Sequence, residues 1–137
     1  MGLILDTSIL IDGERRGEAP EEIIRRMRNK MAGDDISISA ISVVELTHGI
    51  YRATTDARKT RRREFTESIF QGLIVHPVSF EIAQLAGKIE GEQAARGIAI
   101  PIQDLLIGVT ALTLSYSVAT LNPRHFQMIP DLKIVAL

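Results

Sequence analysis

Short apolar runs alternate along this chain with longer segments whose apolar residues recur at helical spacing. The short runs predict five strands, at residues 2–5, 36–39, 73–78, 118–120 and 134–136. The longer segments predict helices at 7–12, 21–31, 42–53, through a basic segment that ends before Gly72, at 79–96 and at 102–114. Strands that alternate with helices indicate an α/β fold with a mostly parallel sheet.

Length and composition limit the class of protein. With 137 residues, 45% of them hydrophobic, the chain is expected to form a single domain over 1–137 with one substantial core. The apolar runs are too short to cross a bilayer, and no export segment is recognisable at the start, so we expect a cytoplasmic protein with no membrane partner. The absence of cysteine excludes disulfides, thiolate zinc sites and cysteine nucleophiles.

Charge is distributed unevenly although the net charge is only −1. Residues 52–64 contain six basic and two acidic side chains, a local charge of +4, so the remainder of the chain carries −5. This basic segment is either a solvated helix face or a surface that contacts RNA phosphates. The four Phe and two Tyr, with no Trp, leave little capacity for base stacking.

Polar side chains accompany the apolar segments at four separated places. Asp6 and Asn122 each follow a predicted strand, whereas Glu45 and Asp104 stand within predicted helices. In a parallel sheet, sites form beyond the carboxyl ends of the strands. An acid beside a buried element is costly unless it has a partner, so we expect these side chains to share one site.

Asp6, Glu45 and Asp104 form the candidate acid cluster. Two like charges about 4 Å apart repel by roughly 4 kcal/mol at an effective dielectric constant near 20, so three ionised carboxylates need a cation or protons. Mg²⁺ and Mn²⁺ prefer oxygen ligands, and either ion can activate water and offset charge on a phosphodiester. The cluster therefore favours metal-dependent hydrolysis of nucleic acid.

Each of these residues also has a local explanation. Asp6 could cap the helix that follows it, and Glu45 stands three residues after Ser42, as in a capping box. Asn122 precedes a proline and could simply form a turn. Asp104 could cap its own helix, but it is embedded among apolar residues, which makes this explanation the weakest of the four.

Other polar side chains are less informative. Arg124 and His125 could contact phosphate or could be ordinary surface groups. His48 and His76 stand alone and are interpreted as structural or solvated residues.

Four motifs together resemble one known family. They are Leu-Ile-Leu-Asp-Thr-Ser at 3–8, Ser-Ala-Ile-Ser-Val-Val-Glu-Leu at 39–46, Ile-Pro-Ile-Gln-Asp-Leu-Leu-Ile-Gly at 100–108 and Ala-Thr-Leu-Asn-Pro-Arg-His-Phe at 119–126. In this order and at these separations the chain resembles the PIN-domain ribonucleases, specifically the VapC-type toxins of bacterial toxin–antitoxin pairs. The resemblance covers nearly the full length.

The resemblance implies a three-layer α/β/α fold with a five-stranded, mostly parallel sheet. It also implies a Mg²⁺- or Mn²⁺-dependent endoribonuclease that forms a homodimer, acts on RNA and is inhibited by a small antitoxin protein. Asp6, Glu45 and Asp104 would be the metal-binding acids, and Asn122 would take a fourth position that is often Asp in the family. Thr120 would support the site by hydrogen bonding.

Rival functions differ in plausibility. A phospho-acceptor receiver domain needs paired acids after its first strand, and an Asp-x-Asp phosphatase needs a second Asp close to Asp6; both are missing. A catalytically inactive PIN-like module that only binds RNA or protein remains the alternative, because Asn122 is a weaker metal ligand than a carboxylate.

The antitoxin is expected to bind along the exposed parts of helices 21–31 and 42–53. Val44, Ile50 and Tyr51 of the second segment, with Ile41 just before it, are more apolar than one internal face requires.

Overall fold

A computed structural model describes residues 2–31 and 35–137 and contains a five-stranded, all-parallel sheet in the order β3-β2-β1-β4-β5. The strands are β1 (Gly2–Leu5), β2 (Asp35–Ser39), β3 (Ile74–His76), β4 (Ser117–Thr120) and β5 (Ile134–Ala136). β1 is the central strand, with Leu3 paired to Ile36 on one side and to Ser117 on the other. The predicted mostly parallel sheet of five strands is confirmed.

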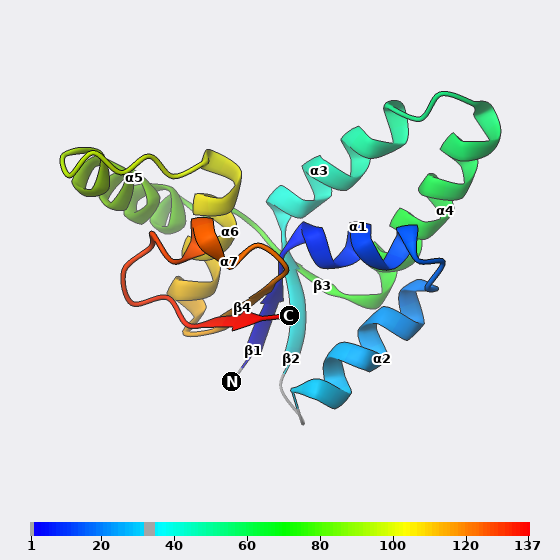
Figure 1. The fold of residues 1–137 in the computed structure, drawn as a ribbon, viewed down its shortest axis with the longest axis horizontal. Helices are drawn as coiled ribbons and strands as arrows, with labels where there is room; N and C mark the ends of the chain where they lie inside the picture. The colour runs from blue at the N-terminus through cyan, green and yellow to red at the C-terminus, as the bar shows by residue number, and fades with distance from the viewer. Residues whose placement is uncertain (1, 32–34) are drawn as a thin grey trace.

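Helices cover both faces of this sheet, so the three-layer prediction is also confirmed (Figure 1). The helices are α1 (Thr7–Arg15), α2 (Pro20–Lys30), α3 (Ala40–Tyr51), α4 (Asp56–Gly72), α5 (Phe80–Ala94), α6 (Ile102–Leu114) and α7 (Pro123–Phe126). Right-handed crossovers account for the layers: the chain runs from β1 to β2 to β3 in one direction and then returns past β1 to β4. The helices α1 to α4 therefore lie together, and α5, α6 and α7 lie on the opposite side of the sheet.

The core consists of two apolar layers separated by the sheet. Leu3 and Leu5 of β1 pack in the layer formed with α1, α2, α3 and α4, whereas Ile4 packs in the layer formed with α5 and α6. All three side chains are fully buried. Successive strand residues point to opposite faces, so a strand covered on both sides is apolar throughout, and this is why β1 reads as a continuous apolar run.

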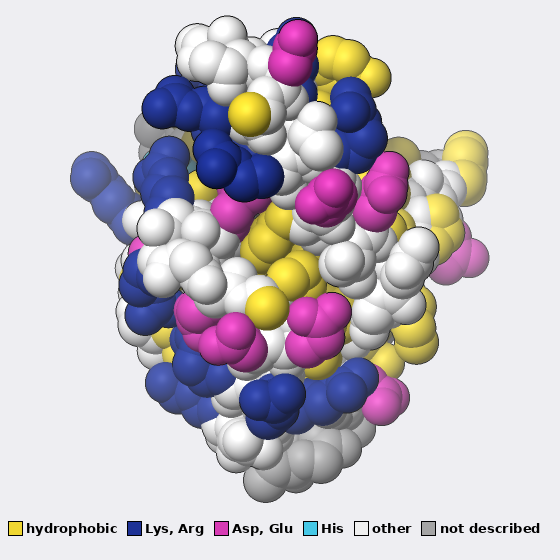
Figure 2. Space-filling model, turned by 90° about the vertical axis from the view of Figure 1, so that its right-hand side faces the viewer, with side chains coloured by type: hydrophobic (Ala, Val, Ile, Leu, Met, Phe, Trp, Pro, Cys, Tyr) yellow, Lys and Arg dark blue, Asp and Glu magenta, His cyan; other side chains and the backbone are white. Residues whose placement is uncertain are grey.

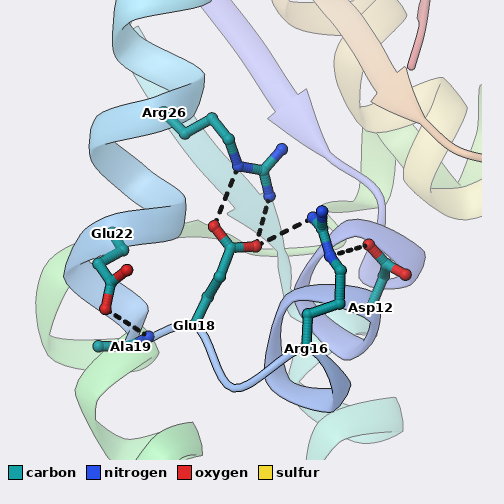
Figure 3. Close-up of polar contacts among 6 residues, drawn as sticks. All are labelled: Asp12, Arg16, Glu18, Ala19, Glu22 and Arg26. Atoms are coloured by element: carbon teal, nitrogen blue, oxygen red, sulfur yellow. Dashed lines mark hydrogen bonds and ion pairs between the residues drawn. The ribbon is translucent and has the colours of Figure 1, made fainter.

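The connection between α1 and α2 is shorter than predicted. The expected helix over 7–12 continues to Arg15, and α2 begins at Pro20, one residue before the expected start at residue 21. Proline suits the first turn of a helix, and Glu22 accepts a hydrogen bond from the backbone N–H of Ala19 at 3.2 Å. Figure 3 shows this contact together with the ion pairs of Glu18 that tie the connection down.

The start of α3 corrects one of the local explanations. The helix begins at Ala40, and Ser39 caps it by accepting a hydrogen bond from the backbone N–H of Ile41 at 3.1 Å. Ser42 therefore lies inside the helix, and a capping box formed by Ser42 and Glu45 is wrong. The helix also ends at Tyr51 rather than at residue 53.

Other boundaries agree in part. Ser79 caps α5 by accepting from the backbone N–H of Ile82 at 3.2 Å, and this helix, expected over 79–96, ends at Ala94. The helix over 102–114 is confirmed, the third strand covers only Ile74–His76 of the expected 73–78, and the short helix α7 was not predicted. Within residues 2–31 and 35–137, no helix combines the length and apolar character needed to cross a membrane.

Candidate active site

The candidate site lies where β1 and β4 meet in the sheet. This is the switch point of the fold, because the strands that follow β1 are added on one side of it and β4 and β5 on the other. The chain leaves β1 toward β2 on one side, and β4 pairs with β1 on the other. Asp6 directly follows β1, and its backbone N–H donates to the carbonyl of Ala119 in β4 at 2.9 Å. The carboxyl ends of such neighbouring strands form a crevice that is the usual place for a site in an α/β sheet.

Asp6 is a buried carboxylate held by two hydroxyl groups. Its side chain is only 6% exposed, and its Oδ2 accepts from Ser8 Oγ at 2.7 Å and from Thr120 Oγ1 at 2.8 Å. Burial raises the pKa of Asp6, and the charge of Asp104 adds to this, although the two hydroxyls act in the opposite direction. The carboxylate makes no capping bond to α1, so helix capping does not explain it.

Thr120 connects Asp6 to Asn122. While its hydroxyl donates to Asp6, Thr120 Oγ1 accepts a hydrogen bond from the backbone N–H of Asn122 at 2.9 Å. Asn122 precedes α7 but makes no side-chain capping bond to it. Its side chain instead belongs to the lining of a cavity of about 460 Å³ that Asp6 and Asp104 also line.

Asp104 enters this cavity from the first turn of α6 and is held by a histidine. Its Oδ2 lies 2.6 Å from Nδ1 of His125, which follows β4 in α7. Because a carboxylate only accepts, the imidazole donates from Nδ1. The sequence interpretation of His125 as a phosphate contact or a surface group missed this pairing, and no local sequence signal connects residues 21 positions apart.

Glu45 approaches from α3 and is held by Thr7. Thr7 Oγ1 lies 2.7 Å from Glu45 Oε1 and 2.8 Å from Ser42 Oγ, so Thr7 donates to the carboxylate while it contacts the serine hydroxyl. Burial raises the pKa of Glu45, and the charges of Asp6 and Asp104 raise it further. Thr7 and Ser8 are supporting residues that sequence reasoning did not single out, and Ser42, considered there only as a helix cap, contacts Thr7.

The three acids influence one another, but they do not all line the same cavity. Glu45 belongs to a second cavity, between α3 and α4, rather than to the one that Asp6 and Asp104 share. Among the residues that the structure describes, no three acidic or histidine side chains are close enough to hold one ion by themselves.

The donor set nevertheless suits a hard cation. Mg²⁺ is usually held by one or two carboxylates and keeps several waters, so two carboxylates and an amide around one cavity are an adequate set of oxygen ligands. The raised pKa values of Asp6 and Glu45 indicate negative charge that is poorly compensated by the protein alone. A divalent cation would compensate this negative charge.

The prediction that the apolar residues of α3 form an exposed groove needs a correction. Ile50 is only 6% exposed and Ile41 packs against the core on the α6 side of the sheet, so neither contributes to an exposed groove. Val44 and Tyr51 are exposed at 60% and 68%. The apolar excess of this helix is therefore partly core, and only Val44 and Tyr51 remain available to a partner.

The isolated histidines differ from each other. His76 contacts Ser37 Oγ through Nε2 at 3.0 Å and packs edge-on against Tyr116, so it is structural. His48 is exposed and lines the second cavity.

We expect His125→Ala to weaken Mn²⁺ binding by about tenfold or more, because groups that orient metal-binding carboxylates typically contribute 10- to 100-fold to affinity. His125→Asn keeps a donor near the position of Nδ1 and should retain most of the affinity. Calorimetric titration of the two variants and the wild type with Mn²⁺ measures the difference, and equal affinity for all three would contradict the orienting role.

The chain is similar to known proteins over most of its length. A family model described as PIN domain matches residues 3–131. A protein of Rickettsia bellii named Ribonuclease VapC is 32% identical over 137 residues, covering 100% of this chain and 97% of that protein.

Solved structures show the same fold. VapBC from Salmonella typhimurium, solved bound to DNA, is 25% identical, with a TM-score of 0.84 over 99% of this chain and 98% of that one. VapBC2 from Rickettsia felis, bound to a DNA fragment from its promoter, superimposes with a TM-score of 0.85 at 22% identity over 100% of this chain and 99% of that one.

Proposed function

This chain belongs to the PIN domain family, and from that membership we propose that it is a divalent-metal-dependent endoribonuclease that acts as the toxin of a toxin–antitoxin pair. The observation that carries the proposal is the buried Asp6 beside Asp104 in one cavity at the switch point of the sheet. The name Ribonuclease VapC of a relative that spans the whole chain supports the activity. The VapBC complexes among the similar structures support a small antitoxin as the protein partner.

The proposal assigns a role to each acid. Asp6 and Asp104 hold Mg²⁺ or Mn²⁺, with Asn122 beside them, and Glu45 completes the site from α3 directly or through a water molecule. When bound, such an ion supplies a Lewis acid that activates water and offsets negative charge on the phosphodiester.

The chain's own residues orient this site. Ser8 and Thr120 fix the Asp6 carboxylate, His125 fixes that of Asp104, and Thr7 fixes that of Glu45. Arg124 lines the same cavity as Asp6 and Asp104 and is placed to contact a phosphate of the RNA. The protein thereby holds its charged groups in position before the substrate arrives, which lowers the cost of reorganisation during the reaction.

The remaining parts of the proposal follow from the family. One nuclease domain spans residues 1–137, works in the cytoplasm and forms a homodimer. The inactive binding module stays a second candidate because Asn122, an amide, takes the fourth position.

Removal of divalent ions is expected to abolish cleavage. RNA incubated with the purified chain in EDTA should stay intact, and an excess of Mg²⁺ or Mn²⁺ should restore cleavage, since the carboxylates alone provide no nucleophile activation. Gel analysis of a labelled single-stranded RNA provides the measurement. Cleavage that persists in EDTA would refute the metal-dependent mechanism, and a chain that neither binds Mn²⁺ nor cleaves RNA would be the inactive module.

A further inference from the structure

Two adjoining cavities extend from Glu45 along α4, on the side of the molecule that carries α1 to α4. One, of about 490 Å³, has Glu45 in its lining, and the other, of about 840 Å³, lies beside the α1–α2 connection. They share Glu14, Arg15 and Arg62, so they form one continuous hollow. We call it the arginine channel, after its lining residues Arg15, Arg52, Arg58, Arg61 and Arg62.

The guanidinium groups of the channel are available to a ligand. Among the described residues, none of the five lies within the 4.0 Å of a carboxylate oxygen that defines an ion pair. Arg62 donates to the carbonyl of Gly49 at 2.6 Å, which fixes it against α3, and Arg58 contacts the hydroxyl of Thr54 at 3.4 Å. Arginines that line a hollow and form no close ion pair favour a ligand with several negative charges.

Among the described residues, four acids also line the channel, one fewer than its arginines: Glu14, Glu18, Glu45 and Glu64. Glu18 at its edge accepts hydrogen bonds from Arg26 and forms an ion pair with Arg16 at 3.0 Å, as Figure 3 shows. Burial raises the pKa of Glu14, while Arg62 and Arg15 beside it act in the opposite direction. Figure 2 shows this face, with Lys and Arg side chains above and below a hollow whose floor is apolar and whose rim carries acids.

We propose that the arginine channel binds the sugar–phosphate backbone of single-stranded RNA and leads it to the acid site. The inference rests on the proposed nuclease function and names the surface that holds its substrate. Three carboxylates repel a polyanion, so an acid site that takes RNA needs positive charge close by. The channel can supply this charge because Glu45 itself belongs to its lining. Among the described lining residues, Phe65 is the one Phe, Tyr or Trp, so the channel offers little base stacking and would contact mainly phosphates.

The test compares two variants with the same loss of charge. The channel variant is Arg52→Gln, Arg58→Gln and Arg61→Gln; Arg62 is kept because it ties α4 to α3. The control is Arg25→Gln, Arg28→Gln and Lys30→Gln, three exposed residues of α2 that line neither cavity. Thermal unfolding followed by circular dichroism verifies that both variants fold.

RNA binding is measured by fluorescence anisotropy with a labelled oligouridylate in EDTA, over a range of salt concentrations. The channel variant should lose roughly tenfold or more in affinity, and the slope of log K against log salt should become shallower by about 2, since each lost phosphate contact changes it by about 0.7. In cleavage assays with Mg²⁺, KM should rise while kcat stays within about twofold. The lost phosphate contacts would bind the substrate and the transition state equally, so their removal weakens substrate binding without raising the barrier of the bound complex. The control should bind like the wild type.

Two results would overturn the inference. Equal losses in both variants would show that general electrostatic attraction, not the channel, binds RNA. Unchanged RNA binding by the channel variant, with loss of binding to a co-expressed antitoxin, would assign the channel to the protein partner. Because binding is measured without metal, an inactive chain that still binds RNA through the channel would refute the proposed function and leave this inference standing.

Discussion

Asp104→Asn reduces divalent-dependent RNA cleavage by about 100-fold or more, because Asp104 would help to hold the ion that offsets the developing phosphate charge, and loss of one such stabilising interaction typically costs at least that factor. The substitution keeps the size of the side chain and leaves an oxygen that can still accept from His125. It removes one of the two carboxylates that line the cavity with Asn122. The loss should therefore come from chemistry and metal binding, with the fold retained.

The matched control is Asp35→Asn. Asp35 is an exposed acid at the start of β2, whereas Asp6 follows the end of β1, and in a parallel sheet these positions lie at opposite edges. Initial rates on a labelled RNA, with circular dichroism of each variant, measure the effect. Full activity of Asp104→Asn would contradict the assignment of Asp104, and an equal loss in Asp35→Asn would indicate a general charge effect.

The second large effect is on stability. Without divalent ions, Asp6→Asn should be more stable than the wild type at neutral pH, because burial and the charge of Asp104 raise the pKa of Asp6 above its ordinary value of 3.8. A carboxyl with a raised pKa binds more protons in the folded state than in the unfolded state. The free energy of unfolding therefore falls as pH rises from the pKa of the unfolded chain to the raised pKa of the folded protein. The advantage of the variant should thus be absent at strongly acidic pH and complete above the raised pKa.

Divalent ions should reverse this order. A ligand present at about 100 times its Kd stabilises the folded state by about 2.7 kcal/mol, which for a chain of this size raises the Tm by roughly 10 °C. The wild type should show this shift with Mn²⁺, and Asp6→Asn should lose most of it.

Thermal unfolding of both proteins with EDTA and with Mn²⁺, at several pH values, measures both effects. The difference between variant and wild type isolates Asp6 from other titrating groups. A metal-free Asp6→Asn that is less stable than the wild type at neutral pH would show that the hydrogen bonds from Ser8 and Thr120 outweigh burial. An undiminished Mn²⁺ shift in the variant would exclude Asp6 as a ligand.

The strands and most helices were predictable because their signals are local. β1 is an apolar run that helices cover on both faces, and Ser79 caps α5 through a bond three residues away. Boundaries were less predictable where tertiary contacts extend an element. The α1–α2 connection is short because Glu18 is held by Arg26, eight residues along the chain.

The site was predictable only in part. The positions of Asp6 and Asn122 after strands indicated one edge of the sheet, and the structure brings both to one cavity with Asp104. The pairing of Asp104 with His125 and of Glu45 with Thr7 could not be read from the sequence, because the partners are 21 and 38 residues apart. The capping box at Ser42 was wrong because Ser39 starts the helix earlier.

By itself, the order of residues determined an alternating α/β chain with acids beside buried elements, since burial and backbone periodicity act over short distances. The tertiary structure decided which hydroxyl or imidazole holds each acid and that Glu45 faces a different cavity from Asp6 and Asp104. It also decided that arginines of α1, of α4 and of the residue after α3 line one hollow. These are contacts between segments far apart in the chain, and only the winding of the sheet brings them together.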